Sequence, residues 1–203
     1  MLDLGACKGD FSKGVTIKYG CKAIALEPFP VLYNQIEVNE NIKKLNYAIS
    51  NNNGEILFYE SSLETAGNII APKPNSTGKT INVKCITLKK LLSEINIKKI
   101  DILKIDIEGA EKILFDNLTD AEILDNDQIT IEFHDSVTYP NISGEEVGLI
   151  ISRLRKLGLK GFSVDYRNYD WLFVNSFRIK IPFFTRIYLH VRKIFNVLKH
   201  FIS

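Results

Sequence analysis

The sequence has few cysteines and few histidines, with three of each among its 203 residues. The cysteines are Cys7, Cys21 and Cys85, and their spacing fits neither a paired zinc motif nor a disulfide framework. No basic segment followed by an apolar one precedes Asp3, so a cleaved secretory signal is not expected. These absences together predict a cytoplasmic protein.

Acidic residues are missing from residues 171–203, although that segment holds six lysines and arginines. The net charge of the whole chain is only +2, so the rest of the chain is mildly acidic. Binding to nucleic acid needs a basic face on the folded domain itself. We therefore expect no nucleic-acid partner. The hydrophobic content of 45% is that of an ordinary globular protein.

Apolar runs rich in Ile, Val and Leu alternate with helical patterns, which predicts an α/β fold with a mainly parallel sheet. The predicted strands lie near residues 1–5, 22–27, 44–49, 55–60, 80–86, 101–106, 128–134, 161–166 and 171–175. The predicted helices lie near residues 10–19, 30–42, 87–95, 109–118, 144–157 and 183–202.

Three connections carry signals of their own. The turn at residues 51–54 is expected to join its two flanking strands in antiparallel fashion. Residues 167–170 are expected to close a hairpin at the sheet edge. The long segment 61–79 is either a lid or substrate loop, or an excursion without such a role.

The domain boundaries follow from the same patterns. Because Met1 falls inside the first predicted strand, we expect an N-terminally shortened domain over residues 1–176. Residues 177–203 form a separate tail.

The beginning of the chain combines a strand, a turn with Gly5 and Gly9, and a helix, which is typical of a nucleotide-type site. A dinucleotide fingerprint starting at Gly5 needs glycines where Cys7 and Asp10 stand, so a pyrophosphate ligand is disfavoured. The carboxylate of Asp3 suits the cationic methionine portion of S-adenosylmethionine. Alternatively, Asp3 caps the turn.

The second predicted strand ends in Glu27, followed by Pro28. A carboxylate at this point can accept hydrogen bonds from both ribose hydroxyls of an adenosine-containing cofactor. The alternative is an exposed glutamate at a strand end.

Five blocks of sequence together resemble the FkbM family of S-adenosylmethionine-dependent methyltransferases. They are DLGACKGDFS at 3–12, LEPFP at 26–30, NYAIS at 46–50 with Gly54, DILKIDIEGAE at 101–111, and IEFH at 131–134. The resemblance covers about residues 2–135 and implies a class I methyltransferase (Rossmann-like) fold. Such a fold has a mainly parallel seven-stranded sheet with helices on both faces, and its activity is usually directed at oxygen.

The resemblance also implies the residues of the cofactor site. They are Asp3, Gly5, Ala6, Gly9, Phe11, Glu27, Pro28, Ala48 and Asp106. Among them, Glu27 would hold the ribose, Ala48 would approach the adenine, and Asp106 would lie near the reacting methyl group.

A hydroxyl acceptor needs a base, and His134 is the first candidate because it follows an apolar strand and is the histidine outside the tail. A hydrogen-bonded structural histidine is the alternative. Asp106 and Glu132 either fix the cofactor amine or orient His134. A divalent metal held by Asp106, Glu108, Glu132 and His134 is a further option that the spacing does not compel.

The tail combines apolar residues at helical spacing with basic ones, and Pro182 precedes it as expected at a helix start. The apolar residues are Phe183, Phe184, Ile187, Tyr188, Val191, Ile194, Phe195, Leu198, Phe201 and Ile202. Such a basic amphipathic helix is expected to lie on an anionic membrane surface, with the protein peripheral to the inner face. The alternative is packing on the domain or on another subunit.

The sequence thus predicts an S-adenosylmethionine-dependent O-methyltransferase that acts on a hydroxyl of a sugar, glycolipid or related metabolite. Two alternatives stay open at this point. One is a membrane-associated nucleotide-binding protein with little catalytic activity, and the less favoured one is a nicotinamide-dependent oxidoreductase.

Overall fold

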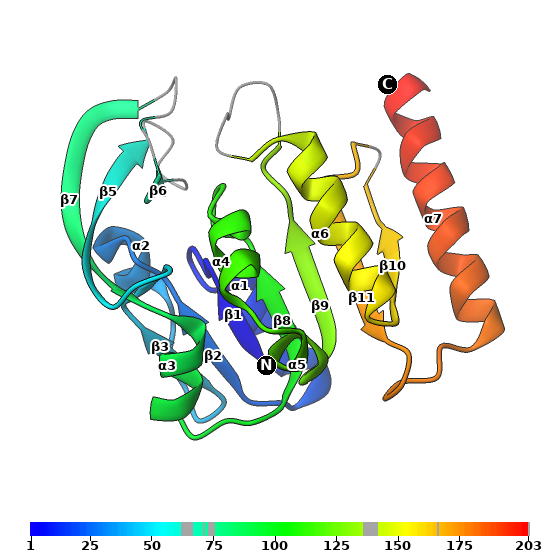
Figure 1. Ribbon diagram of the computed structural model, residues 1–203, viewed down its shortest axis with the longest axis horizontal. Coiled ribbons are helices and arrows are strands. Elements are labelled where there is room, and N and C mark those ends of the chain that lie inside the picture. Colours follow the sequence, from blue (N-terminus) through cyan, green and yellow to red (C-terminus); the bar gives the residue numbers. More distant parts are fainter. Residues whose placement is uncertain (62–66, 71, 73–75, 136–141, 166, 203) are drawn as a thin grey trace.

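The computed structural model describes residues 1–61, 67–70, 72, 76–135, 142–165 and 167–202. These residues form two β-sheets with helices packed around the larger one (Figure 1). The predicted α/β fold is therefore confirmed. No helix in this part of the chain combines the length and the apolar character needed to cross a bilayer.

The larger sheet has seven strands in the order β10-β11-β9-β8-β1-β2-β3. Their bounds are β1 Leu2–Leu4, β2 Ala23–Leu26, β3 Ile42–Leu45, β8 Ile100–Ile105, β9 Asn126–Glu132, β10 Leu159–Ser163 and β11 Asp170–Asn175. The sheet is mixed because β11 runs antiparallel to both of its neighbours, while the pairs from β9 to β3 are parallel. The hairpin between β10 and β11 was predicted and is confirmed.

A second sheet has four strands in the order β4-β7-β5-β6. Its strands are β4 Ala48–Ile49, β5 Gly54–Ser61, β6 Gly67–Asn68 and β7 Ser76–Ile86. The predicted antiparallel pairing across residues 51–54 is wrong, because β7 lies between β4 and β5 and pairs with both.

The predicted single strand 44–49 is also wrong, because β3 and β4 belong to different sheets. The side chain of Asn46 between them donates to the carbonyls of Glu27 and Pro28 at 2.7 and 3.0 Å. These bonds hold the chain at the end of β2, and so the strand breaks here.

Seven helices lie in the described part of the chain: α1 Asp10–Tyr19, α2 Pro30–Gln35, α3 Leu88–Glu94, α4 Glu111–Asn117, α5 Asp120–Leu124, α6 Gly144–Lys156 and α7 Phe183–Ile202. The predicted helix 30–42 is too long. The amine of Lys44 on β3 binds the carbonyls of Tyr33 and Ile36 and thereby caps the end of α2. Helix α5 was not predicted, although Thr119 and Glu122 form a capping box there.

The two faces of the larger sheet pack differently. Leu2 and Leu4 point into a large apolar cluster with residues of α3, α4 and α6, which lie on one side of the sheet (Figure 1). On the other face, the small side chains of Ala23 and Ala25 join a separate cluster, next to which α1 contacts β2 and β3. Asp3, between the two leucines, therefore points toward the α1 side.

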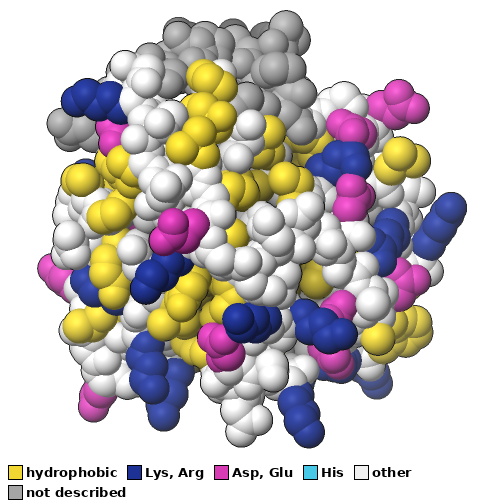
Figure 2. Space-filling view, turned by 60° about the vertical axis from the view of Figure 1, so that its left-hand side comes forward, with side chains coloured by type: hydrophobic (Ala, Val, Ile, Leu, Met, Phe, Trp, Pro, Cys, Tyr) yellow, Lys and Arg dark blue, Asp and Glu magenta, His cyan; other side chains and the backbone are white. Residues whose placement is uncertain are grey.

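The surface on the side of the four-stranded sheet carries charges of both signs. Figure 2 shows hydrophobic side chains gathered in its middle and upper parts, with basic and acidic side chains interspersed around them. No field of a single sign covers this face.

Candidate functional site

Two adjoining cavities lie at the carboxyl ends of the central parallel strands. The first is lined by residues from the ends of β1, β2 and β8 and from the four-stranded sheet, among them Gly5, Glu27, Pro28, Leu32, Ala48, Phe58 and Ile69. The second is more polar and is lined by Ala6, Lys8, Asp10, Phe11, Lys104, Ile105, Thr130, Glu132 and Asp170. Cys7 and Asp106 line both cavities, so the two spaces meet at these residues.

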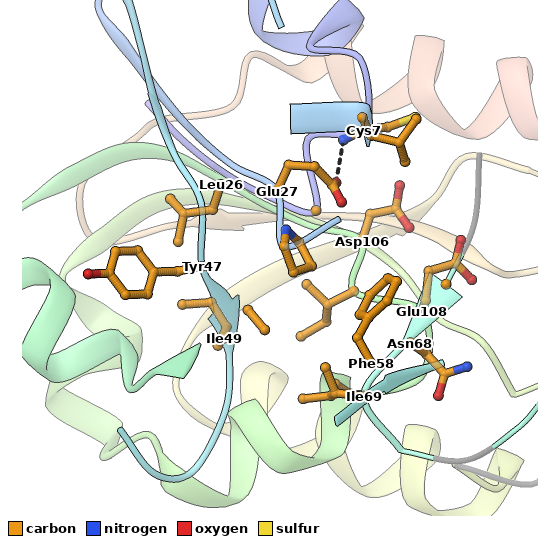
Figure 3. A pocket seen from close by; sticks show the side chains of 17 residues that line it. Cys7, Leu26, Glu27, Tyr47, Ile49, Phe58, Asn68, Ile69, Asp106 and Glu108 are labelled. Atoms are coloured by element: carbon orange, nitrogen blue, oxygen red, sulfur yellow. Dashed lines mark hydrogen bonds between the residues drawn. The ribbon is translucent and has the colours of Figure 1, made fainter. Parts of the chain in front are cut away.

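One part of the first cavity is an apolar slot. Pro28, Ala48, Phe58 and Ile69 line it. In Figure 3, Phe58 and Ile69 lie below Glu27, and the Tyr47 ring points away from them. Gly67 allows β6 to approach here, because a Cβ at this position would lie 2.4 Å from the Phe58 ring.

Part of the predicted lid segment 61–79 thus lines the first cavity, through residues 67–69. Residues 62–66, 71 and 73–75 of this segment lie outside the described residues. The role of a lid stays a prediction.

The carboxylate of Glu27 forms the polar wall of the first cavity. It is 5% exposed and accepts hydrogen bonds from the backbone N–H groups of Cys7 and Phe29, both at 2.9 Å. Figure 3 shows the bond from Cys7. Burial raises the pKa of Glu27 to about 7, even though both donors act to lower it. Each carboxylate oxygen keeps a second lone pair, so Glu27 can accept further hydrogen bonds from a ligand.

The glycine turn between β1 and α1 is fixed by close backbone contact. Gly5 has a φ of +77°, and a Cβ on it would lie 1.7 Å from the carbonyl oxygen of Asp106. Gly9, with a φ of +84°, precedes the first turn of α1. Both positions therefore require glycine.

The structure places most of the predicted cofactor residues at the two cavities. Gly5, Glu27, Pro28, Ala48 and Asp106 line the first cavity, whereas Ala6, Phe11 and again Asp106 line the second. Asp3 and Gly9 line neither of these cavities, and Asp3 is fully buried.

Asp3 acts instead within the framework of the site. It accepts a hydrogen bond from the Ser12 hydroxyl of α1 at 2.7 Å and forms an ion pair with Lys104 at 3.3 Å. Its carboxylate therefore ties the end of β1 to both α1 and β8.

Lys104 is a residue of the site that sequence reasoning missed. Its amine lies 3.1 Å from the Asp106 carboxylate and donates to the carbonyl of Gly5 at 2.6 Å. Burial acts to lower the pKa of Lys104, but the charges of Asp3 and Asp106 raise it above its usual value. The sequence could have indicated Lys104 through its position two residues before Asp106. Side chains two positions apart along a strand point to the same side of the sheet.

His134 lies among three carboxylates. Its Nδ1 is 3.0 Å from Glu111 Oε1, and its Nε2 is 3.4 Å from Glu108 Oε2 and 3.7 Å from Asp106 Oδ1. Burial acts to lower the pKa of His134, but the hydrogen bond to Glu111 and the negative charges of all three carboxylates raise it to about 9. The imidazole is therefore protonated at neutral pH, and it lines neither cavity.

Glu132 faces the second cavity. Partial burial and the neighbouring charge of Asp106 raise the pKa of Glu132 to about 7. A carboxylate with this pKa exchanges a proton readily near neutral pH.

Asp106, Glu132 and His134 each offer one ligand atom, and these atoms lie within 4.8 Å of one another. Carboxylate and imidazole groups suit a divalent cation, but binding it would require His134 to lose its proton. Glu108 of the predicted set is not part of this group. The metal site stays a prediction.

Comparison with known proteins gives one match. The family model described as Methyltransferase FkbM domain matches residues 3–160. No curated protein and no solved structure matches the chain.

We expect Lys104→Met to lower the free energy of unfolding by about 3–5 kcal/mol, because it leaves the buried Asp3 charge without its partner. The matched control is Lys99→Met, which removes an ion pair of a half-exposed lysine and is expected to change the value by at most about 1 kcal/mol. Urea denaturation followed by circular dichroism measures both. Equal stability of the two variants would contradict the structural role of Lys104.

Proposed function

The chain belongs to the FkbM methyltransferase domain family, and on this premise we propose that it is an S-adenosylmethionine-dependent methyltransferase. We propose further that its acceptor is a hydroxyl of a sugar, a glycolipid or a related metabolite. The observation that carries the proposal is the buried Glu27 carboxylate at the end of β2, which lies beside an apolar slot and accepts a hydrogen bond from Cys7 of the glycine turn.

The first cavity fits the two halves of an adenosine. The slot formed by Pro28, Ala48, Phe58 and Ile69 offers apolar contacts to an adenine ring. The free lone pairs of Glu27 can accept hydrogen bonds from the two ribose hydroxyls. The expected roles of Glu27 and Ala48 are thus compatible with the positions that they occupy.

The far end of the first cavity is acidic. When bound, S-adenosylmethionine would supply an electrophilic methyl group on a positively charged sulfur. Asp106 and Glu108 line the cavity there, and their charges favour a cationic group. Asp106 also borders the second cavity, so it marks the place where acceptor and methyl group can meet.

The second cavity suits a polyhydroxylated acceptor. Asp10, Glu132 and Asp170 supply carboxylate oxygens that accept hydrogen bonds from hydroxyl groups, and Lys8 supplies a donor. Phe11, at 40% exposure, offers an aromatic face to the apolar side of a sugar ring. Holding a hydroxyl here, in line with the methyl group, would supply much of the catalysis.

Glu132 is the proton acceptor that the geometry favours. It lines the acceptor cavity and has a pKa of about 7, whereas His134 lies outside that cavity and is protonated at neutral pH. In this arrangement the imidazolium of His134 holds Asp106 and Glu108 in position. The earlier hypothesis of His134 as the base stays open to the test below.

The two alternative functions lead to different binding results. A nicotinamide-dependent oxidoreductase must hold a pyrophosphate, but the turn carries Cys7 and Asp10 where a dinucleotide site needs glycines. A binding protein without catalysis would take up the cofactor and transfer no methyl group.

We expect calorimetry to show binding of S-adenosylmethionine and no binding of NADH. Glu27→Gln should weaken the binding by at least about tenfold, because it replaces one acceptor oxygen beside the ribose site with an amide donor. Glu94→Gln, on the half-exposed Glu94 of α3, is the control and should leave the affinity unchanged. Binding of NADH alone, or equal affinity of the Glu27→Gln variant, would refute the proposed cofactor site.

We expect methyl-labelled S-adenosylmethionine to label neutral methyl glycosides in a panel that also holds amines, carboxylates and thiols. The carboxylate-lined second cavity supports this choice. Labelling of the amines or thiols alone would refute transfer to oxygen, and labelling of the carboxylates alone would refute a hydroxyl acceptor. Cofactor binding without labelling of any member would favour the binding protein.

The pH dependence of kcat distinguishes the two candidate bases. A proton acceptor must be deprotonated, so kcat rises with pH through the pKa of that group. We expect a midpoint near 7, from Glu132, and not near 9, from His134. Glu132→Gln should abolish the rise. His134→Gln should retain it at reduced kcat, with a higher midpoint, because the charge of His134 acts to lower the pKa of Glu132. A midpoint near 9 that disappears in His134→Gln would identify His134 as the base.

A further inference from the structure

Two of the described side chains of helix α7, those of Leu189 and Lys193, contact the β10-β11 hairpin. Leu189 belongs to a cluster with Phe162 and Val174 of the β10-β11 hairpin. One helical turn later, the amine of Lys193 donates to the side chain of Asn168 at 2.5 Å. Residues four apart lie on the same face of a helix, so Leu189 and Lys193 define the side of α7 that faces the sheet.

The opposite side of α7 presents apolar residues to solvent. Phe183, Phe184, Ile187, Tyr188 and Val191 are 70%, 81%, 43%, 61% and 40% exposed. Their intervals of one, three and four residues place them in a single stripe. Leu189 is two residues from both Ile187 and Val191, which turns it about 200° away from the stripe. The fold therefore buries the narrow side of α7 and exposes its aromatic stripe.

Positive charge lies next to this stripe. Arg192, four residues after Tyr188, is exposed and borders it, whereas the exposed Arg186 lies on the side of α7 that carries Leu189 and Lys193. No acidic residue occurs between Trp171 and Ser203. The exposed side of α7 therefore combines aromatic residues with positive charge alone.

We propose that the exposed stripe of α7, residues 183–191, docks on an anionic membrane surface. A helix with aromatic residues on one face and flanking lysines or arginines lies in the plane of a lipid interface, where anionic headgroups neutralise its charge. Pairing of two copies through the same stripe would bring like-charged flanks together, which opposes a dimer on this face.

The direction in which α7 runs shows where its exposed stripe lies relative to the two cavities. Helix α7 runs in the same direction as β8 and β9, so its C-terminal end lies toward the edge of the sheet at which those strands end (Figure 1). The cavities open at that edge. The stripe itself lies on the N-terminal half of α7, toward the opposite edge of the sheet. The proposal concerns the helix and does not depend on methyl transfer.

The test is flotation of the full chain with two kinds of vesicle, phosphatidylcholine alone and phosphatidylcholine mixed equally with phosphatidylglycerol. We expect recovery with the anionic vesicles only, and less of it at high salt. A triple variant, Phe183→Ser with Phe184→Ser and Tyr188→Ser, should lower the vesicle affinity by at least about tenfold. Arg186→Glu with Arg192→Glu should lower it to a similar extent.

The control removes exposed apolar residues elsewhere, by Ile17→Ser with Leu149→Ser, at positions that are 76% and 65% exposed. This variant should float like the unmodified chain. Equal recovery of the triple variant and the control would overturn the proposal. A chain that fails to float but forms a dimer, which the triple variant dissociates in light scattering, would also overturn it and assign the stripe to a second copy.

Discussion

The site depends on one buried cation, the amine of Lys104, held between the carboxylates of Asp3 and Asp106. Asp3 has no exposed surface, and a buried carboxylate without a counter-charge is strongly destabilising. The same amine binds the carbonyl of Gly5, and a Cβ on Gly5 would collide with the backbone of Asp106. One ion-pair network therefore joins the ends of β1 and β8 and sets the shape of the turn that leads to both cavities.

Negative charge accumulates beyond this network. Asp106 and Glu108 lie close to His134, and Glu132 faces the cavity beside them. Partial burial and the charge of Asp106 raise the pKa of Glu132 to about 7. The pKa of His134 rises to about 9, because the hydrogen bond to Glu111 and the charges of its carboxylate neighbours outweigh the effect of burial. In this site the imidazole keeps its proton while a carboxylate can release one near neutral pH.

Local sequence signals predicted those parts of the fold that local interactions determine. The hairpin of β10 and β11, the glycine turn and α1 are of this kind. The predicted ends of strands and helices were wrong where a side chain from another element determines them. Asn46 separates β3 from β4 by binding the end of β2, and Lys44 ends α2 from the neighbouring strand. The role of Lys104 depends on Asp3, which is far away in the sequence and adjacent in the sheet.

The sequence of the tail also left one feature of its packing undetermined. Its periodicity reveals an apolar stripe, but periodicity does not say whether the stripe faces the protein or the solvent. The structure answers this through Leu189, which packs on the hairpin and leaves Phe184 and Tyr188 outside. A core helix buries its widest apolar face, whereas α7 buries a narrow one. The arrangement therefore keeps most of the apolar surface of residues 183–191 available to a partner, and the surrounding positive charge selects an anionic one.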